Sequence, residues 1–582
     1  MDRMDNVNWD KSSGEGILSL IYEKGTTYGK VTALYHWENH EWKNWTYEQI
    51  TAKVKQVSDY LIEKGIQEDD RIAILSESRP EWVVSFLTAV RCAAVIVPLD
   101  VKLTQTELAA ILNDAGPRLI FASPTHYETA EWLKRNVPSV EHVIQLSSDS
   151  ANPHRLSIHD LRAEADHEVR DRASNETALI VYTSGTTGTP KGVMITFRNL
   201  LYQCNCFEQI VKVNSSDLFL SILPLNHLFE LSIGLLGVLY SGARICYANT
   251  LYPKELVEIM REKRVTRMIA VPLFLKMLKG SIEREVRNAG PRRERMFRTM
   301  LRAAKHIPSR AVRRLLFRPL HQKFGGRLHE FVIGGAPLDV EVGGFFECLG
   351  FTVLQGYGLT ETSPVVAVNT PEHNRLGSVG RPLPGTDVQI TAQGEIIVRG
   401  PAVMSGYYKR PDLTREVIDE QGWFHTGDLG EVDRDGFLRV TGRIKNLIVL
   451  GSGKKVSPEE VETVIADSAL FKEVCVIGAI SREHLAEGTE SVCAIVVPSD
   501  SLVERCANKV ESIAEQAHVE IQRLAENLAP YKRPSKLVLR FEEFPKTSTR
   551  KIKRPLVLEW LRQIEQPESL RQGGSLAKGA VV

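Results

Sequence analysis

One stretch of the sequence decides how the rest of the chain is organised: Tyr182-Thr183-Ser184-Gly185-Thr186-Thr187-Gly188-Thr189-Pro190-Lys191-Gly192. The apolar run 178–181 precedes it, which predicts a buried strand that opens into a loop rich in glycine and hydroxyl residues. Glycines let backbone N–H groups turn toward an anion, and a lysine adds a mobile positive charge. The loop therefore suits phosphate, although its composition fits a solvated linker equally well.

The spacing of this loop excludes the common nucleotide-triphosphate loop. That loop places lysine directly after glycine, with Ser or Thr next and a helix beginning there. Here Thr189 and Pro190 separate Gly188 from Lys191, and glycine follows the lysine. Proline disfavours a helical conformation at the residue before it, and residues 193–195 are typical of a strand. We therefore expect the loop to join two strands.

Length and composition indicate an ordinary globular protein of roughly two to four domains. Among 582 residues, 73 Lys and Arg against 72 Asp and Glu leave no global field that would attract nucleic acid. The eight cysteines are scattered and form no paired C-x-x-C framework for a metal, so we expect reduced thiols in a cytosolic protein. For the close pair Cys204 and Cys206, core packing is favoured over chemistry.

No segment of the sequence is typical of a membrane span or a signal peptide. Residues 1–6 are polar and lack the apolar core of a signal peptide. The most hydrophobic window, 218–240, is interrupted by Asn226, His227 and Glu230. We expect a cytoplasmic protein that is either soluble or peripheral at the inner membrane surface.

Strand and helix patterns alternate in the N-terminal part, which predicts an α/β domain. Residues 46–50 begin a helix with a threonine cap, 71–75 form a strand, 80–93 a helix, and 94–99 another buried strand.

Two later strands are predicted to end in glycine-rich turns. Residues 328–333 run into Gly334-Gly335-Ala336-Pro337-Leu338, and residues 351–354 run into Gln355-Gly356-Tyr357-Gly358-Leu359-Thr360-Glu361-Thr362. In α/β sheets, ligands collect at the carboxyl ends of strands. We therefore expect both turns to serve the same kind of site as the 182–192 loop.

The pattern changes again in the second half of the chain. Short strand-like runs from about 377 to 440 predict a small β-rich subdomain. Ser457-Pro458-Glu459-Glu460 predicts a helix start in which the serine caps and Glu460 completes a capping box. From there to about 562 a βα pattern predicts a separate domain, and the tail from 566 is predicted to be disordered.

Arginines are dense between residues 284 and 327, where apolar residues alternate with them. They are Arg292, Arg293, Arg295, Arg298, Arg302, Arg310, Arg313, Arg314 and Arg318, with Phe297, Leu301, Leu315, Leu316 and Phe317 among them. A basic amphipathic stretch favours contact with an anionic membrane or a phosphorylated ligand. A solvated helical face is the alternative.

Several motifs together resemble the acyl-adenylate-forming superfamily, which comprises acyl-CoA synthetases, peptide-synthetase adenylation domains and luciferases. They are 182–192, 334–338, 355–362, Thr426-Gly427-Asp428, Gly442-Arg443 with Lys445, and 545–551, in order over residues 15–562. The arginine-rich insertion and the runs 223–230 and 453–460 are most similar to the long-chain fatty acyl-CoA synthetase branch.

The resemblance implies an α/β fold with a large N-terminal domain, a small mobile C-terminal α+β domain and a tail. The N-terminal domain, 15–442, would contain two α/β sheet subdomains plus the small β-rich subdomain. The C-terminal domain would span 443–565, and the tail 566–582.

The resemblance also implies a two-step reaction, with ATP and coenzyme A as substrates and Mg²⁺ as cofactor. The carboxylate of a medium- to long-chain fatty acid attacks the α-phosphate of ATP, and the thiol of coenzyme A then displaces AMP. Cations and donors must match the charge that develops on the α-phosphoryl oxygens. The residues assigned to ATP or AMP are Thr183, Ser184, Gly185, Thr186, Thr187, Gly188, Lys191, Gly335, Ala336, Pro337, Gln355, Gly356, Tyr357, Gly358, Leu359, Thr360, Asp428 and Arg443.

Individual roles follow from the same resemblance. Glu361 and Thr186 would hold Mg²⁺, Tyr357 would stack on adenine, and Asp428 would accept hydrogen bonds from the ribose. The alternatives are a helix-start acid for Glu361, a core aromatic for Tyr357 and a plain turn for Asp428. For His227, near the reacting carboxylate, a core or orienting role is as well supported as catalysis.

The implied C-terminal domain would supply lysines. Lys551 would bridge the carboxylate and the α-phosphate during adenylation, and Lys445 would lie at the hinge. The loop for the coenzyme A step would be Gly451, Ser452, Gly453, Lys454 and Lys455. Arg550 stands where the family usually has glycine, and Lys546 and Lys553 are nearby, so the choice of Lys551 rests on motif register.

Two other functions stay open from the sequence. A fatty acyl-AMP ligase would pass its adenylate to a carrier protein, but the insertion typical of such ligases is not evident here. A non-catalytic, membrane-associated lipid-binding protein could share the scaffold, although Lys551, Glu361 and Asp428 argue against it.

Overall fold

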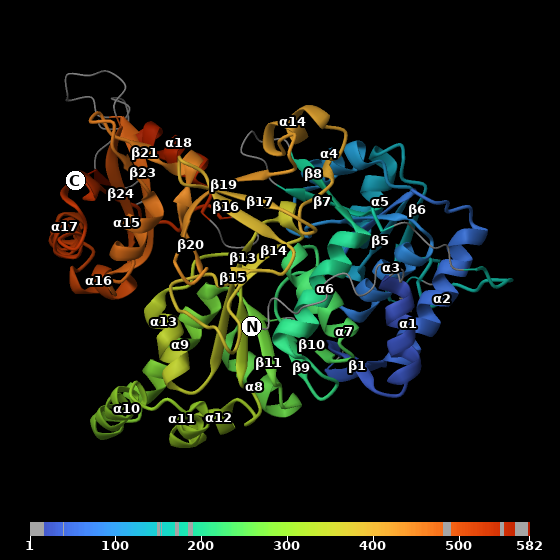
Figure 1. Ribbon diagram of the computed structural model, residues 1–582, viewed down its shortest axis with the longest axis horizontal. Helices are drawn as coiled ribbons and strands as arrows, with labels where there is room; N and C mark the ends of the chain where they lie inside the picture. The colour runs from blue at the N-terminus through green and yellow to red at the C-terminus, as the bar shows by residue number, and fades with distance from the viewer. Residues whose placement is uncertain are drawn as a thin grey trace. The chain divides into compact units, whose positions relative to one another are not determined.

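The computed structural model describes residues 17–38, 40–147, 152, 154–168, 174–183, 190–248, 250–480, 490–546, 552–564 and 580–581. The chain divides into two compact units (Figure 1). Unit 1 contains the chain up to Gln389 together with Ile397–His425 and Asp433–Leu438. Unit 2 contains Ile390–Ile396, Thr426–Val432 and the chain from Arg439 onward.

Unit 1 is built on two large sheets. The nine-stranded sheet has the order β15 (Arg381–Pro382), β14 (Val365–Val368), β13 (Thr352–Gly358), β12 (Glu330–Ile333), β11 (Arg267–Ala270), β9 (Leu218–Ser221), β10 (Arg244–Tyr247), β1 (Thr32–Glu38), β2 (Glu41–Thr46). The seven-stranded sheet has the order β18 (Gly406–Tyr407), β8 (Lys191–Thr196), β7 (Thr177–Thr183), β4 (Val95–Pro98), β3 (Arg71–Leu75), β5 (Leu119–Ala122), β6 (His142–Gln145). The predicted α/β class is confirmed.

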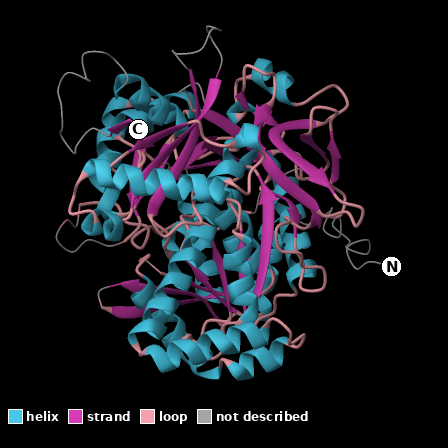
Figure 2. Ribbon diagram, turned by 90° about the vertical axis from the view of Figure 1, so that its left-hand side faces the viewer, coloured by secondary structure: helices cyan, strands magenta, loops and turns pink. Residues whose placement is uncertain are grey.

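Three helical layers alternate with these two sheets. The largest core takes side chains from both sheets and from α1 (Ile17–Thr27), α2 (Tyr47–Glu63), α3 (Pro80–Arg91), α6 (Phe197–Val211) and α7 (Val238–Tyr240), so these helices lie between the sheets. The outer face of the nine-stranded sheet packs on α8 (Pro253–Lys263), α9 (Pro272–Asn288) and α13 (Val340–Cys348). The outer face of the seven-stranded sheet packs on α4 (Gln105–Ala115) and α5 (Tyr127–Asn136). Figure 2 shows helices flanking the strands.

Local sequence signals account for many of these elements. Helix α2 begins after Thr46, whose side chain and that of Gln49 form the two bonds of a capping box. Strand β3 has the predicted bounds, and α3 and β4 follow within two residues of theirs. Alternation of local signals was therefore enough to place this part of the α/β unit.

The two strands predicted on either side of the 182–192 loop are confirmed, and they form a hairpin. Strands β7 and β8 are antiparallel neighbours, and Thr183 pairs with Lys191 at the open end of the ladder. The six residues from Ser184 to Thr189 inclusive lie outside the described residues. The hairpin therefore fixes the start and the end of the predicted phosphate loop.

The turn predicted from Gln355 begins later than expected. Strand β13 runs on through Gly358, because Gly356, Tyr357 and Gly358 pair with antiparallel β14. A Cβ atom at Gly358 would lie 1.6 Å from the carbonyl oxygen of Pro364, so only glycine lets the two strands approach this closely. The turn itself is the 3₁₀ helix Thr360–Thr362.

The predicted β-rich region contains short strands: β16 (Asp387–Ile390), β17 (Glu395–Arg399), β19 (Phe424–Val432) and β20 (Leu438–Arg443). They pair in the order β16-β17-β19-β20. The remaining short helices of unit 1 are α10 (Pro291–Ala304), α11 (Arg310–Leu316), α12 (Arg318–Lys323) and α14 (Pro411–Val417).

Unit 2 contains a sheet with helices on both faces. Its strands are β23 (Phe471–Ile480), β24 (Glu490–Pro498), β25 (Lys536–Leu539) and β26 (Ala580–Val581). Helices α15 (Pro458–Ile465), α16 (Asp500–Arg505) and α17 (Val510–Ala525) share one core, and α18 (Arg554–Ile564) lies in the core of the opposite face. The predicted α+β character of the C-terminal region is confirmed.

One prediction for this region was wrong, and one is not tested. Helix α15 does begin after Ser457, but the serine hydroxyl donates to the carbonyl of Thr441 and contacts Glu459 instead of capping the helix. The predicted disorder of the tail, 566–582, stays a prediction, because only residues 580–581 of it are described, and these pair with β25.

Within the described ranges, no helix is both long and apolar enough to cross a membrane. The window 218–240 instead forms β9, the π-helix Glu230–Gly237 and α7. All eight cysteines lie among the described residues, where they are buried and form no disulfide, and Cys204 and Cys206 lie on α6, which confirms core packing for that pair.

Candidate active site

Three loops meet at the carboxyl edge of the nine-stranded sheet. Strands β9, β11, β12 and β13 run parallel, with Ser221 opposite Ile269 and Ile333 opposite Gln355. A Cβ atom at Gly334, just after β12, would lie 3.0 Å from the Phe229 ring of the loop after β9. The turns predicted to serve one site therefore do lie at one edge.

The glycine turn after β12 exposes its backbone at this edge. Gly335 has φ +83°, a left-handed conformation that favours glycine, and Ala336 and Pro337 are exposed. Gln355 on β13 is buried, and its carbonyl accepts the backbone N–H of Asn369 at 2.9 Å. Tyr357 is half-buried two residues further along the same strand. The predicted adenine-binding residues thus occupy adjacent strand ends.

Lys191 and Glu361 are brought together by a residue that the sequence did not single out. The hydroxyl of Tyr407 donates to the Oε1 atom of Glu361 at 3.0 Å. The Nζ atom of Lys191 lies 5.3 Å from the centre of the Tyr407 ring. One tyrosine therefore links the lysine of the predicted phosphate loop to the predicted metal ligand.

Strand pairing explains how Tyr407 reaches this position. Strand β18 pairs with β8, with Tyr407 opposite Val193, and the backbone N–H of Met404 donates to the carbonyl of Glu361 at 2.9 Å. Burial and the Glu361 carboxylate raise the pKa of Tyr407, so its hydroxyl keeps its proton and acts as a donor. The only sequence signal for the contact of Tyr407 with Glu361 is the aromatic pair Tyr407-Tyr408 in a region rich in turn residues.

The loop after β9 carries His227 and a buried acid. His227 is half-buried, and its carbonyl accepts the N–H of Leu231 at the start of the π-helix. Glu230 is 1% exposed, and neither carboxylate oxygen has a hydrogen-bond partner among the described residues. Burial raises the pKa of Glu230 to about 8. The nearby Ser221 hydroxyl offsets part of this rise in pKa, although the two side chains form no hydrogen bond of ordinary geometry.

Unit 2 brings together two other predicted residues. Asp428, on β19, is buried, and its Oδ1 atom lies 2.6 Å from the Nε atom of Arg443, at the end of β20. The N–H of Asp428 donates to the Thr426 hydroxyl, which itself donates to the carbonyl of Ile396. Asp428 is therefore fixed by backbone bonds and held by a guanidinium.

The remaining predicted residues of unit 2 lie on exposed turns. Lys445 is exposed in the 3₁₀ helix Ile444–Asn446, directly after β20. Residues 450–454 connect β21 (Ile448–Val449) to β22 (Lys455–Val456), so Lys455 opens β22, and Gly453 has φ +76°. The Nζ atom of Lys454 lies 4.5 Å from the centre of the Tyr531 ring, a contact that the sequence did not predict.

Several predicted residues lie outside the described residues. They are Ser184, Gly185, Thr186, Thr187, Gly188 and Lys551. The nearby Lys546 forms an ion pair with Glu473 and lies 3.5 Å from Glu543. Both contacts tie Lys546 to acidic side chains of unit 2, and the choice of Lys551 stays a prediction.

The donor set fits a magnesium ion bound largely by phosphate. Mg²⁺ prefers oxygen ligands and is usually held by one or two carboxylates together with substrate phosphates. Glu361 supplies such a carboxylate beside the hairpin that opens into the phosphate loop. In the described part of the chain, no three His, Cys, Asp or Glu side chains gather into a cluster that could hold a metal by themselves.

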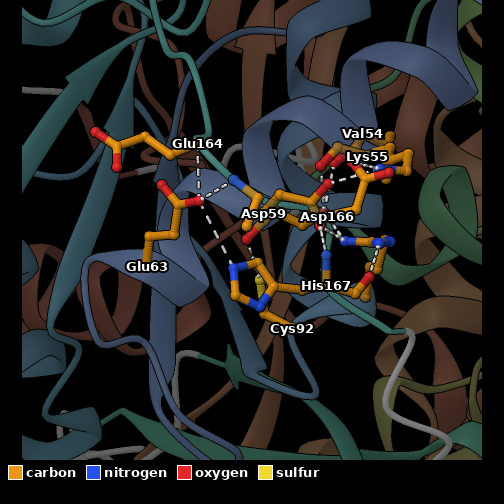
Figure 3. Close-up of polar contacts among 11 residues, drawn as sticks. Val54, Lys55, Asp59, Glu63, Cys92, Glu164, Asp166 and His167 are labelled. Atoms are coloured by element: carbon orange, nitrogen blue, oxygen red, sulfur yellow. Dashed lines mark hydrogen bonds and ion pairs between the residues drawn. The ribbon is translucent and has the colours of Figure 1, made fainter.

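A second polar cluster contains none of the predicted site residues. Its hydrogen bonds hold the segment that precedes β7 against α2 (Figure 3). Asp59 accepts hydrogen bonds from the side chains of Lys55 and Arg91 and from the backbone N–H of His167. Glu63 accepts hydrogen bonds from two backbone N–H groups of the same segment. A hollow of about 380 Å³ borders this cluster. Because its charged groups are paired with one another, we assign the cluster a structural role.

Comparison with known proteins gives consistent matches. The model of the AMP-binding enzyme family matches residues 22–408, and that of the AMP-binding enzyme C-terminal domain matches residues 460–551. The long-chain-fatty-acid–CoA ligase FadD15 of Mycobacterium bovis is 30% identical over 460 residues, which cover 75% of this chain and 76% of that protein.

A relative named for a different acceptor also matches. The chloroplastic long-chain-fatty-acid–(acyl-carrier-protein) ligase AEE15 of Arabidopsis thaliana is 27% identical over 543 residues, which cover 79% of this chain and 73% of that protein. Among solved structures, the ATP-bound RpMatB-BxBclM chimera B1 has a TM-score of 0.77 at 25% identity and covers 95% of this chain and 99% of its own.

Proposed function

We propose, since this chain belongs to the AMP-binding enzyme family, that it joins a medium- to long-chain fatty acid to coenzyme A through an acyl-AMP intermediate. Adenylate-forming acyl-CoA ligase activity follows from the family and its relatives. The chain length of the acid and the role of each residue are our proposals.

The observation that carries the proposal is the link from Lys191 through Tyr407 to Glu361. It places a cation and a carboxylate beside the ends of the hairpin that flanks the glycine-rich loop. A cation suits the phosphates of ATP, and a carboxylate suits the magnesium ion that ATP carries. Bound Mg²⁺ would neutralise charge on the phosphates while they react.

In the first step, a carboxylate oxygen of the acid attacks the α-phosphorus, and the bond from that phosphorus to the bridging oxygen of the β-phosphate breaks. Pyrophosphate leaves, and acyl-AMP forms. We propose that Lys191 and the loop residues 183–188 hold the β- and γ-phosphates, and that Lys551 compensates the charge on the carboxylate and the α-phosphate. Gly335–Pro337 and Tyr357 would hold adenine, and Asp428 with Arg443 the ribose.

In the second step, the thiol sulfur of coenzyme A attacks the acyl carbon, the bond from that carbon to the phosphate oxygen of AMP breaks, and the thiol proton is released. The exposed turn 451–455 would supply Lys454 and Lys455 to the phosphates of coenzyme A. Lys445, on the short 3₁₀ helix after β20, would lie at the hinge between proposed domains 15–442 and 443–565. His227 would orient the reacting carboxylate.

A carrier protein is the alternative acceptor. The relative from Arabidopsis thaliana, named as an acyl-carrier-protein ligase, supports keeping this candidate. The acceptor does not change the first step, so the two functions differ only in what releases AMP.

The deciding experiment measures pyrophosphate and AMP release by the full chain with fatty acids of graded length, ATP and Mg²⁺. We expect pyrophosphate release to be highest for medium- and long-chain acids, and AMP release to require coenzyme A. AMP release that depends on a carrier protein with a free thiol, but not on coenzyme A, would establish the alternative. No acid-dependent pyrophosphate release with any acid would reject both functions.

A further inference from the structure

Helix α10 presents a row of arginines to solvent. Its inner face is apolar: Phe297, Met300, Leu301 and Ala304 recur at helical spacing and pack into the outer core of the nine-stranded sheet. Arg292, Arg295 and Arg302 are exposed on the opposite face, with Arg298 beside them. Glu294 pairs with Arg298 alone, so the outward face of α10 is strongly basic.

In helix α11, by contrast, arginines face the protein and two apolar side chains face solvent. Its arginines turn into the protein: Arg310 bonds the hydroxyl of Thr352, Arg313 bonds the carbonyl of Glu347, and Arg314 bonds the carbonyl of Leu328. Two of its apolar side chains face outward, with Val312 48% and Leu315 68% exposed, whereas Leu316 packs against the outer core of the nine-stranded sheet. Part of the arginine-rich segment is therefore structural, and the helix it anchors exposes apolar surface to water.

The two helices are neighbours, so basic and apolar groups lie close together. The ring of Phe297 on α10 packs edge-on against that of Phe317, directly after α11, with centroids 5.7 Å apart. Met296, next to the arginine row on α10, is 59% exposed. Figure 1 shows α10 to α12 as a group at one end of unit 1. We name Arg292, Arg295, Arg302, Met296 and Leu315 the α10–α11 surface.

We infer that the α10–α11 surface docks the protein on an anionic lipid bilayer. Arginines attract the negative charge of lipid headgroups, and exposed Met and Leu side chains gain free energy by entering the boundary between headgroups and acyl chains. A soluble polyanion such as a nucleotide would use the arginines but would gain nothing from Leu315 or Met296. This inference does not depend on the proposed function, because binding needs neither ATP nor an acid.

The test is co-sedimentation of the full chain with vesicles, without ATP or fatty acid. We expect binding to vesicles that contain phosphatidylglycerol, little binding to pure phosphatidylcholine, and a decrease with added salt. The triple variant Arg292→Gln, Arg295→Gln, Arg302→Gln is expected to bind on the order of 10- to 100-fold more weakly. The double variant Met296→Ser, Leu315→Ser is expected to bind several-fold more weakly at the same charge.

A matched triple variant controls for net charge. Lys30, Arg135 and Lys254 are exposed on other elements of unit 1, and changing all three to Gln removes the same charge. We expect this variant to bind like the wild type. Equal loss in both triple variants would reject the α10–α11 surface as the docking site.

The apolar variant separates a bilayer from a soluble anion. Wild-type binding by Met296→Ser, Leu315→Ser, combined with release from vesicles by low concentrations of inorganic pyrophosphate, would mean that the arginines form a soluble-anion site, and the inference would be wrong. Thermal unfolding of every variant checks that these exposed substitutions leave the fold intact.

Discussion

The polar groups predicted for catalysis are held differently in the two units. In unit 1, Lys191 at the start of β8 and Glu361 in the 3₁₀ turn after β13 are half-buried and share Tyr407. In unit 2, Lys445 and Lys454 are exposed on short turns, and Lys455 is exposed at the start of β22. Half-buried groups held by tertiary contacts keep a ligand geometry, whereas exposed groups can move to a reacting centre. We therefore expect substitutions in unit 1 to affect nucleotide binding and folding, and loop lysines to affect one half-reaction without affecting stability.

The largest expected effect is that of Lys551→Ala on adenylation. Removing one donor that stabilises transition-state charge typically lowers the rate by about 10²- to 10³-fold, or ~3–4 kcal/mol. Thioester formation from supplied acyl-AMP should be largely unchanged, because the phosphoryl transfer is already complete. Single-turnover assays of the two half-reactions measure this difference.

Lys553→Ala is the matched control for this loop. It removes an exposed lysine two residues away and should leave both half-reactions near the wild-type rate. A similar loss in both half-reactions for Lys551→Ala would contradict the assignment of this lysine to adenylation. A large loss for Lys553→Ala would show that the motif register is wrong.

The second prediction concerns the buried acid of unit 1. Glu230 keeps its proton in the folded protein up to a pKa of about 8, whereas in the unfolded chain it ionises near 4.5. Between these values the folded state binds more protons, so its stabilising contribution is complete below pH 4.5 and is lost as pH rises toward 8. Glu230→Gln removes this dependence, and we expect its stability, relative to the wild type, to rise by about 3 kcal/mol between pH 5.5 and 8.5.

Urea denaturation at several pH values measures this effect. Glu255→Gln, at an exposed position of α8, is the control and should keep the wild-type pH dependence. If Glu230→Gln and the wild type respond to pH in parallel, the carboxyl is ionised when folded. In that case a partner outside the described residues must compensate its charge.

Much of the fold could be predicted from local sequence signals. The apolar run 178–181, the glycine-rich loop and Pro190 placed a hairpin that the β7–β8 pairing confirms. Apolar runs and turn residues likewise predicted that the turns after β12 and β13 lie at the carboxyl edge of a sheet. These features depend on neighbouring residues, so periodicity and turn chemistry are sufficient to find them.

The features that were missed depend on contacts between distant parts of the chain. Tyr407 reaches Glu361 only because β18 pairs with β8, which no local pattern indicates. Ser457 does not cap α15 because its hydroxyl donates a hydrogen bond to the carbonyl of Thr441. The arginines of α11 point inward because carbonyls of later segments accept their bonds. Hydrogen-bond partners from distant parts of the chain determine the orientation of these side chains, so the local sequence could not predict it.

The smallest expected effect tests the link between Lys191 and Glu361. Tyr407→Phe removes the hydroxyl that donates to Glu361 but keeps an aromatic ring near Lys191. A lost hydrogen bond to a charged acceptor costs about 1.5–3 kcal/mol when both groups are buried, and less here because Glu361 is only half-buried. We expect adenylation to slow by about tenfold. Most of the change should appear in the Mg²⁺ concentration that gives half-maximal rate, because the tyrosine orients the predicted metal ligand.

Tyr408→Phe is the matched control, since it removes a hydroxyl from the adjacent tyrosine, whose ring lies near Lys409. It should leave the Mg²⁺ dependence unchanged. Tyr407→Leu also removes the ring near Lys191 and should weaken ATP binding in addition. If Tyr407→Phe shifts thermal stability but not the Mg²⁺ dependence, Tyr407 only supports packing. The contrast between fixed groups in unit 1 and exposed lysines in unit 2 would then rest on burial alone.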